Sequence, residues 1–300
     1  TCHVSLPGRY LVFMPTVDHI GVSRRIEGEG ERRRLKETIS RVRPAKTGVI
    51  VRTASGKQTD KKLKADLDYL VTTWNEIQKK FLKSRTPSPV YQDLTIVLRA
   101  IRDMFTDEVD KVVVDSRTQH KAIMKFVTRF IPAVKDKVEQ YEGDMPIFDA
   151  FGIETELSRA MERKVWLKSG GYLVIDQAEA LVAIDVNTGR YVGKKTLEET
   201  ILKTNLEAVK EIAYQLRLRN CGGIIILDLI DMEKEANREK VYKALEEALK
   251  KDRARPSILK ISQLGLVEMT RKRTRDSLVR SLCEPCSYCE GKSFVKNKLT

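Results

Sequence analysis

Glu179-Ala-Leu-Val-Ala-Ile-Asp-Val186 and Ile224-Ile-Ile-Leu-Asp-Leu-Ile230 are two apolar runs of strand length, and a helical stretch from Leu197 to Arg219 lies between them. The stretch is expected to be a helix because its apolar residues recur on one face, and Asn220 and Gly222-Gly223 end it. A strand, helix, strand connection is a crossover that makes its two strands parallel. We therefore predict an α/β domain, with the continuous run 224–230 buried on both faces.

A carboxylate lies near the carboxyl end of each run, at Asp185 and at Asp228. Asn187 falls on the same strand face as Asp185, because side chains alternate with a period of two. Parallel strands bring their carboxyl ends to one edge of the sheet, where open α/β sheets bind ligands. A carboxylate buried in these strands without a partner is costly, so each is expected to need a cation or hydrogen-bond donors.

We expect Asp185, Asp228 and Asn187 to converge on one hard cation, Mg²⁺ or Mn²⁺, because such ions prefer oxygen ligands and engage phosphate groups. A cation of this kind polarises a scissile phosphate and lowers the pKa of an attacking water. The structural alternative is an Asx-type turn made by Asp185 and Asn187, together with an ion pair between Asp228 and a neighbouring Arg. Asp231, of opposite strand parity, is expected to cap the following helix.

The rest of the chain also alternates between helix and strand patterns, so the fold class is α/β, or α+β with several domains. Residues 85–89 end the preceding helical pattern and are expected to be a domain boundary, and residues 143–146 are expected to form a hinge. Strands are expected at 9–14, 48–53, 111–115, 166–175, 179–186 and 258–261, with 166–175 and 179–186 forming a hairpin, and further helices at 29–42, 60–84, 94–105, 116–130 and 233–251.

Composition favours a globular protein that contacts a polyanion. The 300 residues are 41% hydrophobic and 33% charged, and the length predicts two or three domains. The net charge of +14 is concentrated in residues 21–62, at +8, and residues 251–300, at +7. Two basic regions are typical of an RNA or DNA partner, although a charge run is usually only a solvated surface. Without an apolar transmembrane run or a signal peptide, a cytoplasmic protein is expected, and the missing initial Met suggests a fragment.

Three of the five cysteines lie in Cys283-Glu-Pro-Cys286-Ser-Tyr-Cys289. They form the CxxC pairs 283/286 and 286/289, which have metal-ligand spacing, but a tetrahedral zinc site needs four ligands and no suitable ligand follows. We expect a second copy of the chain to supply the others, with zinc on a symmetry axis. The alternatives are reduced thiols and a redox motif; the latter is disfavoured because redox CxxC motifs begin a helix after a buried strand.

Several motifs, taken in order, resemble the bacterial endoribonuclease E/G family, and the resemblance covers nearly the whole chain. The motifs are Pro7-Gly-Arg-Tyr-Leu-Val12, Ser23-Arg-Arg-Ile26, Val51-Arg-Thr-Ala54, Ala183-Ile-Asp-Val-Asn187, Thr204-Asn-Leu-Glu-Ala208, Gly223-Ile-Ile-Ile-Leu-Asp-Leu-Ile-Asp-Met232, Glu268-Met-Thr-Arg-Lys-Arg273 and Cys286-Ser-Tyr-Cys289. The resemblance implies Mg²⁺-dependent hydrolysis of single-stranded RNA that leaves 5′-phosphate ends. It also implies stimulation by a 5′-monophosphate, and roles in rRNA and tRNA maturation and mRNA decay.

The resemblance implies that Asp185 and Asp228 hold the catalytic Mg²⁺, and that Asn187 positions the metal-bound group or the scissile phosphate. One alternative is a non-catalytic, zinc-linked RNA-binding scaffold. Another is a metal-dependent deoxyribonuclease, which would cleave single-stranded DNA at least as well as RNA. A histidine-based ribonuclease is disfavoured, because no histidine lies near these candidates in the sequence.

By the same resemblance, Arg52 and Thr53, with the backbone of Gly8 and Val12, match a pocket that senses a 5′-monophosphate. The residue types suit that role, because Arg binds phosphate through a fork of donors and a hydroxyl adds another. The alternative for Arg52 is a surface salt bridge.

The resemblance also implies that two protomers share one structural zinc ion, each through a CxxC pair. The match falls on Cys286 and Cys289, and Cys283 is then a free thiol or a replacement ligand. A homodimer, with a homotetramer as a further option, is the expected assembly.

Four domains are implied: a 5′-monophosphate sensor at 1–88, a ribonuclease-H-like segment without catalytic carboxylates at 89–160, a deoxyribonuclease-I-like catalytic domain at 161–280, and a zinc link and tail at 281–300. The family also carries an OB-fold RNA-binding domain before the Pro7 region and a small dimerisation domain beyond the zinc motif. The sequence given contains no pattern for either.

Overall fold

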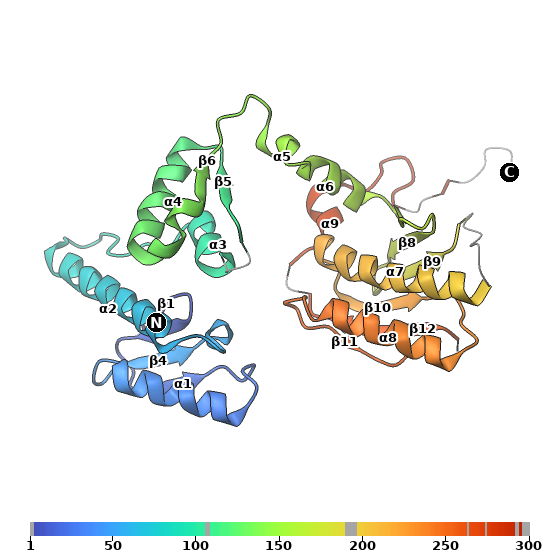
Figure 1. The fold of residues 1–300 in the computed structure, drawn as a ribbon. Coiled ribbons are helices and arrows are strands. Elements are labelled where there is room, and N and C mark those ends of the chain that lie inside the picture. The colour runs from blue at the N-terminus through green and yellow to red at the C-terminus, as the bar shows by residue number, and fades with distance from the viewer. Residues whose placement is uncertain are drawn as a thin grey trace. The chain divides into compact units, whose positions relative to one another are not determined.

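The structure is a computed structural model that describes residues 3–105, 109–189, 197–262, 264–273, 275–291 and 294–295. The chain divides into two compact units, residues 1–144 and 145–300, each of which is followed separately in Figure 1. The division falls inside the stretch 143–146 that the sequence predicted as a hinge. Residues 145–160, which the sequence grouped with the ribonuclease-H-like segment, belong to the second unit.

The first part of unit one is a four-stranded sheet covered by two helices. The strands β1 (Leu6–Pro7), β2 (Leu11–Met14), β3 (Ile20–Val22) and β4 (Gly48–Val51) lie in the order β1-β2-β4-β3. Helices α1 (Glu29–Val42) and α2 (Asp60–Lys83) bury their apolar faces in the core of this sheet. The Thr59 side chain caps α2 by accepting the N–H of Lys62.

The remainder of unit one has a smaller core of its own. Helices α3 (Ile96–Met104) and α4 (Arg117–Phe130) contribute Ile101, Phe126 and Val127 to that core. Strands β5 (Val112–Val114) and β6 (Val138–Gln140) form a parallel pair. The short 3₁₀ helices are η1 (Thr53–Ser55) and η2 (Pro132–Lys137).

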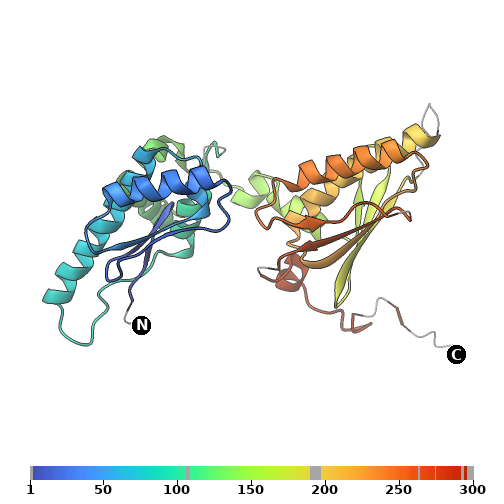
Figure 2. The same ribbon diagram turned by 90° about the horizontal axis from the view of Figure 1, so that it is seen from below.

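Unit two is built on a six-stranded mixed sheet in the order β11-β12-β10-β9-β8-β7. Its strands are β7 (Lys164–Trp166), β8 (Tyr172–Gln177), β9 (Leu181–Asn187), β10 (Gly223–Asp228), β11 (Ser257–Ile258) and β12 (Leu266–Arg271). Helix α7 (Leu197–Leu218) connects β9 to β10, which are parallel as the crossover predicts. Both α7 and α8 (Glu235–Leu249) lie on one face of the sheet, as Figure 2 shows.

Because both helices cover the same face, the other face of the sheet is left open. Ile225 and Leu227 of β10 are fully buried beneath the helices, whereas Ile224 is 52% exposed. The prediction that run 224–230 is buried on both faces is therefore wrong. Asp185 and Asp228 project from the exposed side, so the expectation of buried carboxylates is also wrong. The physical reason is that β10 pairs with the antiparallel β12 in a mixed sheet, which needs cover on only one face.

Other differences concern turns and short elements. The predicted strand 166–175 is two strands, β7 and β8, separated by a turn in which Gly170 has a φ of 92°. The sequence missed β12 and the helices α5 (Ile147–Ala150) and α6 (Ile153–Met161). Helix α8 begins after Lys234, so Asp231 does not cap it. A last short helix, α9, covers Leu278–Leu282, and none of the helices in the described ranges is long and apolar enough to cross a membrane.

Candidate functional site

The two candidate carboxylates are direct neighbours across the open face of unit two. Asp185 of β9 and Asp228 of β10 are paired in register in the parallel ladder. Asn187, one pleat further along β9, donates from Nδ2 to Asp185 Oδ2 at 2.7 Å. The structure thus brings together the three residues that the sequence singled out, through the crossover that the sequence also predicted.

The electrostatics of this pair favour a cationic ligand. Partial burial, followed by the charges of Asp185 and Asp231, raises the pKa of Asp228. None of the ion pairs formed among the described residues includes Asp185 or Asp228, so the predicted alternative, an Arg partner for Asp228, is not seen there. Two carboxylates and an amide oxygen suit a hard cation such as Mg²⁺.

The protein provides only part of a coordination shell at this point. Within the described ranges, no group of three or more His, Cys, Asp or Glu side chains is placed to hold a metal ion. Mg²⁺ is commonly bound through one or two carboxylates, with water and substrate phosphate completing its octahedron. A pair of carboxylates on an exposed face matches that pattern better than an enclosed metal cage.

Two glycine turns hold the end of β9; the sequence predicted a turn at Thr188-Gly189 only as an alternative to a metal site, and it gave Gly170-Gly171 no role. A Cβ atom at Gly171 would lie 2.7 Å from the Asn187 carbonyl oxygen, and one at Gly189 would lie 2.4 Å from the Gly170 carbonyl oxygen. Only glycine permits such close backbone approach. The two adjacent glycines, Gly170 and Gly171, were the feature of the sequence that could have predicted this tight turn.

Asn205 positions the segment that follows Asp228. Its fully buried side chain donates to the Ile230 carbonyl at 2.8 Å and accepts the Ile230 N–H at 3.1 Å. The residue lies in a motif that the resemblance included without a role. Helix α7 therefore fixes the loop beyond β10 through two hydrogen bonds between the Asn205 side chain and the Ile230 backbone.

In unit one, the structure brings Arg52 to the backbone of Gly8. The Arg52 guanidinium donates to the Gly8 carbonyl and lies 3.0 Å from Asp103 Oδ1. Thr53 Oγ1 is 2.9 Å from Ser23 Oγ, and Val12 lies on β2 opposite Ile50. The alternative role for Arg52, a surface ion pair, is thus present as well.

Asp66 of α2 shapes the Gly8 loop and was not predicted. Its carboxylate accepts three backbone N–H groups, from Arg9 at 3.0 Å, Tyr10 at 2.8 Å and Leu11 at 2.9 Å. A Cβ atom at Gly8 would lie 2.5 Å from Asp66 Oδ2, so glycine is required there. Burial raises the pKa of Asp66 although these three donors act in the opposite direction. No sequence signal marks Asp66, because its partners lie more than fifty residues away.

The cysteine cluster separates into a pair and a single thiol. Hydrogen bonds from the backbone N–H groups of Cys289 and Tyr288, and from the Cys289 side chain, lower the pKa of Cys286. Cys283 instead lies with its Sγ 3.5 Å from Met161 Sδ of α6. Cys286 and Cys289 therefore face one another, and Cys283 is turned toward the body of unit two.

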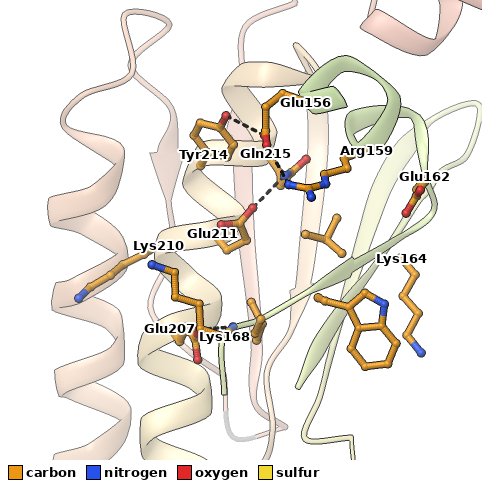
Figure 3. Close-up of a pocket in the computed structure, with 13 residues that line it drawn as sticks. Glu156, Arg159, Glu162, Lys164, Lys168, Glu207, Lys210, Glu211, Tyr214 and Gln215 are labelled. Carbon is orange, nitrogen blue, oxygen red and sulfur yellow. Dashed lines mark hydrogen bonds and ion pairs between the residues drawn. The ribbon is translucent and has the colours of Figure 1, made fainter. Parts of the chain in front are cut away.

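A cavity of about 880 Å³ lies between α6, β7 and α7 (Figure 3). Four carboxylates and four cationic side chains line it, so its charges balance. Tyr214 Oη lies 3.5 Å from Glu156 Oε2, and Gln215 Nε2 donates to Glu211 Oε1 at 2.8 Å. Neither Asp185 nor Asp228 is among its lining residues, but Lys164 and Trp166 of β7 are.

Comparison with known proteins identifies the family. Residues 5–274 match the model of the Ribonuclease E/G family. Ribonuclease G of Escherichia coli (strain K12) is 47% identical over 296 residues, which are 99% of this chain and 60% of the relative. Ribonuclease G of Haemophilus influenzae is 44% identical with the same coverage, and Ribonuclease E of Nostoc sp. is 37% identical over 97% of this chain and 43% of the relative. The chain spans 60% of the length of these ribonuclease G relatives, and it belongs to the ribonuclease E/G family.

Proposed function

We propose that this protein is an endoribonuclease that hydrolyses single-stranded RNA at Asp185 and Asp228 and leaves 5′-phosphate ends. The observation that carries the proposal is the in-register pairing of these two carboxylates on an exposed sheet face, in a member of the ribonuclease E/G family. Family-typical tasks, namely rRNA and tRNA maturation and mRNA decay, form part of the proposal.

The carboxylates of Asp185 and Asp228 would hold Mg²⁺, or Mn²⁺ in its place. Bound there, the ion would polarise the scissile phosphate and lower the pKa of the attacking water. The β9–β10 ladder fixes the spacing of the two carboxylates, which reduces the reorganisation that binding requires. Asn187 holds Asp185 in position through its amide N–H, which donates to Asp185 Oδ2.

The test is Mg²⁺-dependent cleavage of a 5′-monophosphorylated single-stranded oligoribonucleotide. We expect Asp185→Asn and Asp228→Asn each to lower kcat at least a hundredfold, because each removes a charge that holds the ion. Asp176→Asn is the matched control, because Asp176 belongs to the neighbouring strand β8 but pairs with Arg163. We expect it to keep nearly full activity.

Activity that survives both substitutions at the proposed site would refute the assignment. Binding of RNA without cleavage by the unmodified chain would favour the scaffold alternative. Cleavage of the matching DNA oligonucleotide at an equal or greater rate would favour a deoxyribonuclease.

We further propose that Arg52 and Thr53, with the backbone of Gly8 and Val12, receive the 5′-monophosphate of the RNA. The closeness of Arg52 to the Gly8 carbonyl and of Thr53 to Ser23 supports this placement. A bound phosphate would compete with Asp103 for the Arg52 guanidinium. Burial raises the pKa of Asp103, but hydrogen bonds from Arg102 and Arg52 outweigh it and hold the pKa below its usual range.

Cys286 and Cys289 are proposed to hold one zinc ion jointly with the same pair from a second protomer, which makes the protein a homodimer. The exposed Cys286 and the half-buried Cys289, at CxxC spacing, supply half of a tetrahedral site. Mass spectrometry under native conditions should then find one zinc per two chains, with loss of zinc and dimer in Cys286→Ser. Cys283→Ser serves as the control and should retain both. One zinc per single chain would contradict sharing.

A further inference from the structure

Aromatic and basic side chains lie on the open face of unit two, one and two strands away from Asp185. Tyr172 of β8 is the cross-strand partner of Asn187, and Trp166 of β7 is the cross-strand partner of Tyr172. Directly opposed residues in antiparallel strands share a face. A row therefore runs from Trp166 at the sheet edge, through Tyr172, to Asn187, across two strand spacings of about 4.8 Å each.

The parallel row one pleat away ends on the proposed catalytic residues. Lys164 is paired with Val174, which is paired with Asp185, which is paired with Asp228. Lys164 is thus separated from Asp185 by Val174 alone, and the cationic, aromatic and acidic side chains of β7 to β10 share one face of the sheet. Nothing in the proposed metal site accounts for them.

The side chains of Lys164, Trp166 and Tyr172 form a compact cluster. The Trp166 and Tyr172 ring centroids are 5.4 Å apart with an interplanar angle of 62°. Lys164 Nζ lies 4.1 Å from the Trp166 centroid and 3.5 Å from that of Tyr172, so it covers one face of each ring. Trp166 nevertheless remains 64% exposed. An indole held in place by a cation and a second ring, yet open to solvent, is arranged to stack on a ligand.

We propose that Trp166, Tyr172 and Lys164 form a platform that binds one nucleobase of single-stranded RNA, and its adjoining phosphate, next to the bond that is cut. The base stacks on the open face of Trp166, Tyr172 braces the indole from the side, and the Lys164 ammonium neutralises the phosphate. This inference rests on the proposed ribonuclease function. Because every base has an aromatic face, such a platform holds the strand without selecting its sequence.

A nucleic acid is favoured over a protein partner by charge. The cation in this cluster lies against the rings themselves, and the same unit contains the basic region 251–300, which carries a net charge of +7. Stacking on aromatic side chains combined with basic groups is how proteins hold single-stranded RNA. A strand of RNA bound to Trp166 of β7 has only the width of β8 to cross before it reaches Asp185 of β9.

Kinetics of the full chain test the platform. We expect Trp166→Leu to raise KM for a 5′-monophosphorylated single-stranded oligonucleotide about tenfold, equivalent to about 1.4 kcal/mol, and to leave kcat within about twofold. Trp166→Phe should recover most of the affinity, because it keeps a stacking face. Phe148→Leu on α5, a 48% exposed aromatic outside the sheet, is the control and should leave KM unchanged.

An RNA-side change separates stacking from general damage. Oligonucleotides with a single abasic position, moved one nucleotide at a time past the cleavage site, should show one position at which the unmodified chain loses about tenfold in affinity. For the oligonucleotide that is abasic at that position, Trp166→Leu should bind as tightly as the unmodified chain does. An equal penalty for Trp166→Leu on intact and abasic RNA would overturn the proposal, even if the variant is also less stable.

Binding without cleavage keeps this inference distinct from the function on which it rests. In the Asp185→Asn chain, RNA should quench tryptophan fluorescence, and Trp166→Phe should abolish the quench because the second tryptophan, Trp74, packs against the hydrophobic core of unit one. Quenching of Asp185→Asn by RNA, together with no cleavage of RNA by the unmodified chain, would uphold the platform and refute the nuclease. Cleavage with an unchanged KM in Trp166→Leu would uphold the nuclease and refute the platform.

Discussion

At the scale of single residues, the most consequential pair outside the site is Arg271 with Asp252. Their side chains are 6% and 3% exposed, and Arg271 Nε lies 2.7 Å from Asp252 Oδ2. The same guanidinium donates to the Cys221 carbonyl at 2.6 Å. This network fixes the end of β12 to the loop after α8. A buried charge that loses its partner is far costlier than an exposed one.

Asp252→Ala should therefore lower the unfolding free energy of unit two by about 3–5 kcal/mol. Burial raises the pKa of Asp252, but the bonds from Arg271 and the Ala254 N–H outweigh it and hold the pKa below its usual value. The folded state thus binds this proton more weakly than the unfolded chain does. The stabilisation is complete above about pH 4 and is lost as the pH falls through the lowered pKa.

Urea unfolding at pH 7 and at pH 3 measures this effect. The difference between Asp252→Ala and the unmodified chain should shrink at the lower pH. Glu247→Ala removes the exposed ion pair with Lys250 and is the control, with an expected loss below about 1 kcal/mol. An equal loss at the two pH values would contradict the assigned role of the ion pair.

At the scale of elements, the sequence predicts what local periodicity determines. Helix α1 has the predicted bounds 29–42, and the crossover makes β9 and β10 parallel, which places Asp185 beside Asp228. An apolar run does not reveal which face of a strand the helices will cover, and so the burial of β10 was predicted wrongly. The contacts of Arg52 with Asp103, 51 residues away, leave no local pattern at all.

The turn between β7 and β8 offers a test at the same scale. Gly171→Ala would place its Cβ against the Asn187 carbonyl oxygen, so the end of β9 must shift. We expect kcat to fall about tenfold or more, because Asn187 moves relative to Asp185, and stability to fall by about 1–3 kcal/mol. Gly30→Ala in α1, where no atom lies within 4 Å of the added Cβ, should leave both unchanged or stability slightly higher. Unchanged kinetics of Gly171→Ala would contradict a positioning role for this turn.

At the scale of the whole molecule, the two proposed activities belong to different units. Gly8, Val12, Arg52 and Thr53 all lie in unit one, whereas Asp185, Asn187 and Asp228 lie in unit two. Among the described residues, each hydrophobic core is likewise made within one unit: two cores lie in unit one, and the sheet core with α7 and α8 lies in unit two. A unit that has its own hydrophobic core can fold in the absence of the other unit.

Residues 145–300 produced alone should therefore fold and keep metal-dependent cleavage, but they should lose the preference for a 5′-monophosphate. The ratio of kcat/KM for 5′-phosphorylated over 5′-hydroxyl oligonucleotides should fall to about one for this fragment. Arg52→Ala in the full chain should lower the same ratio without lowering the rate on 5′-hydroxyl RNA, because it removes the phosphate contact and leaves unit two intact. A fragment that still prefers the 5′-phosphate would place the sensor in unit two and refute the role proposed for Arg52 and Thr53.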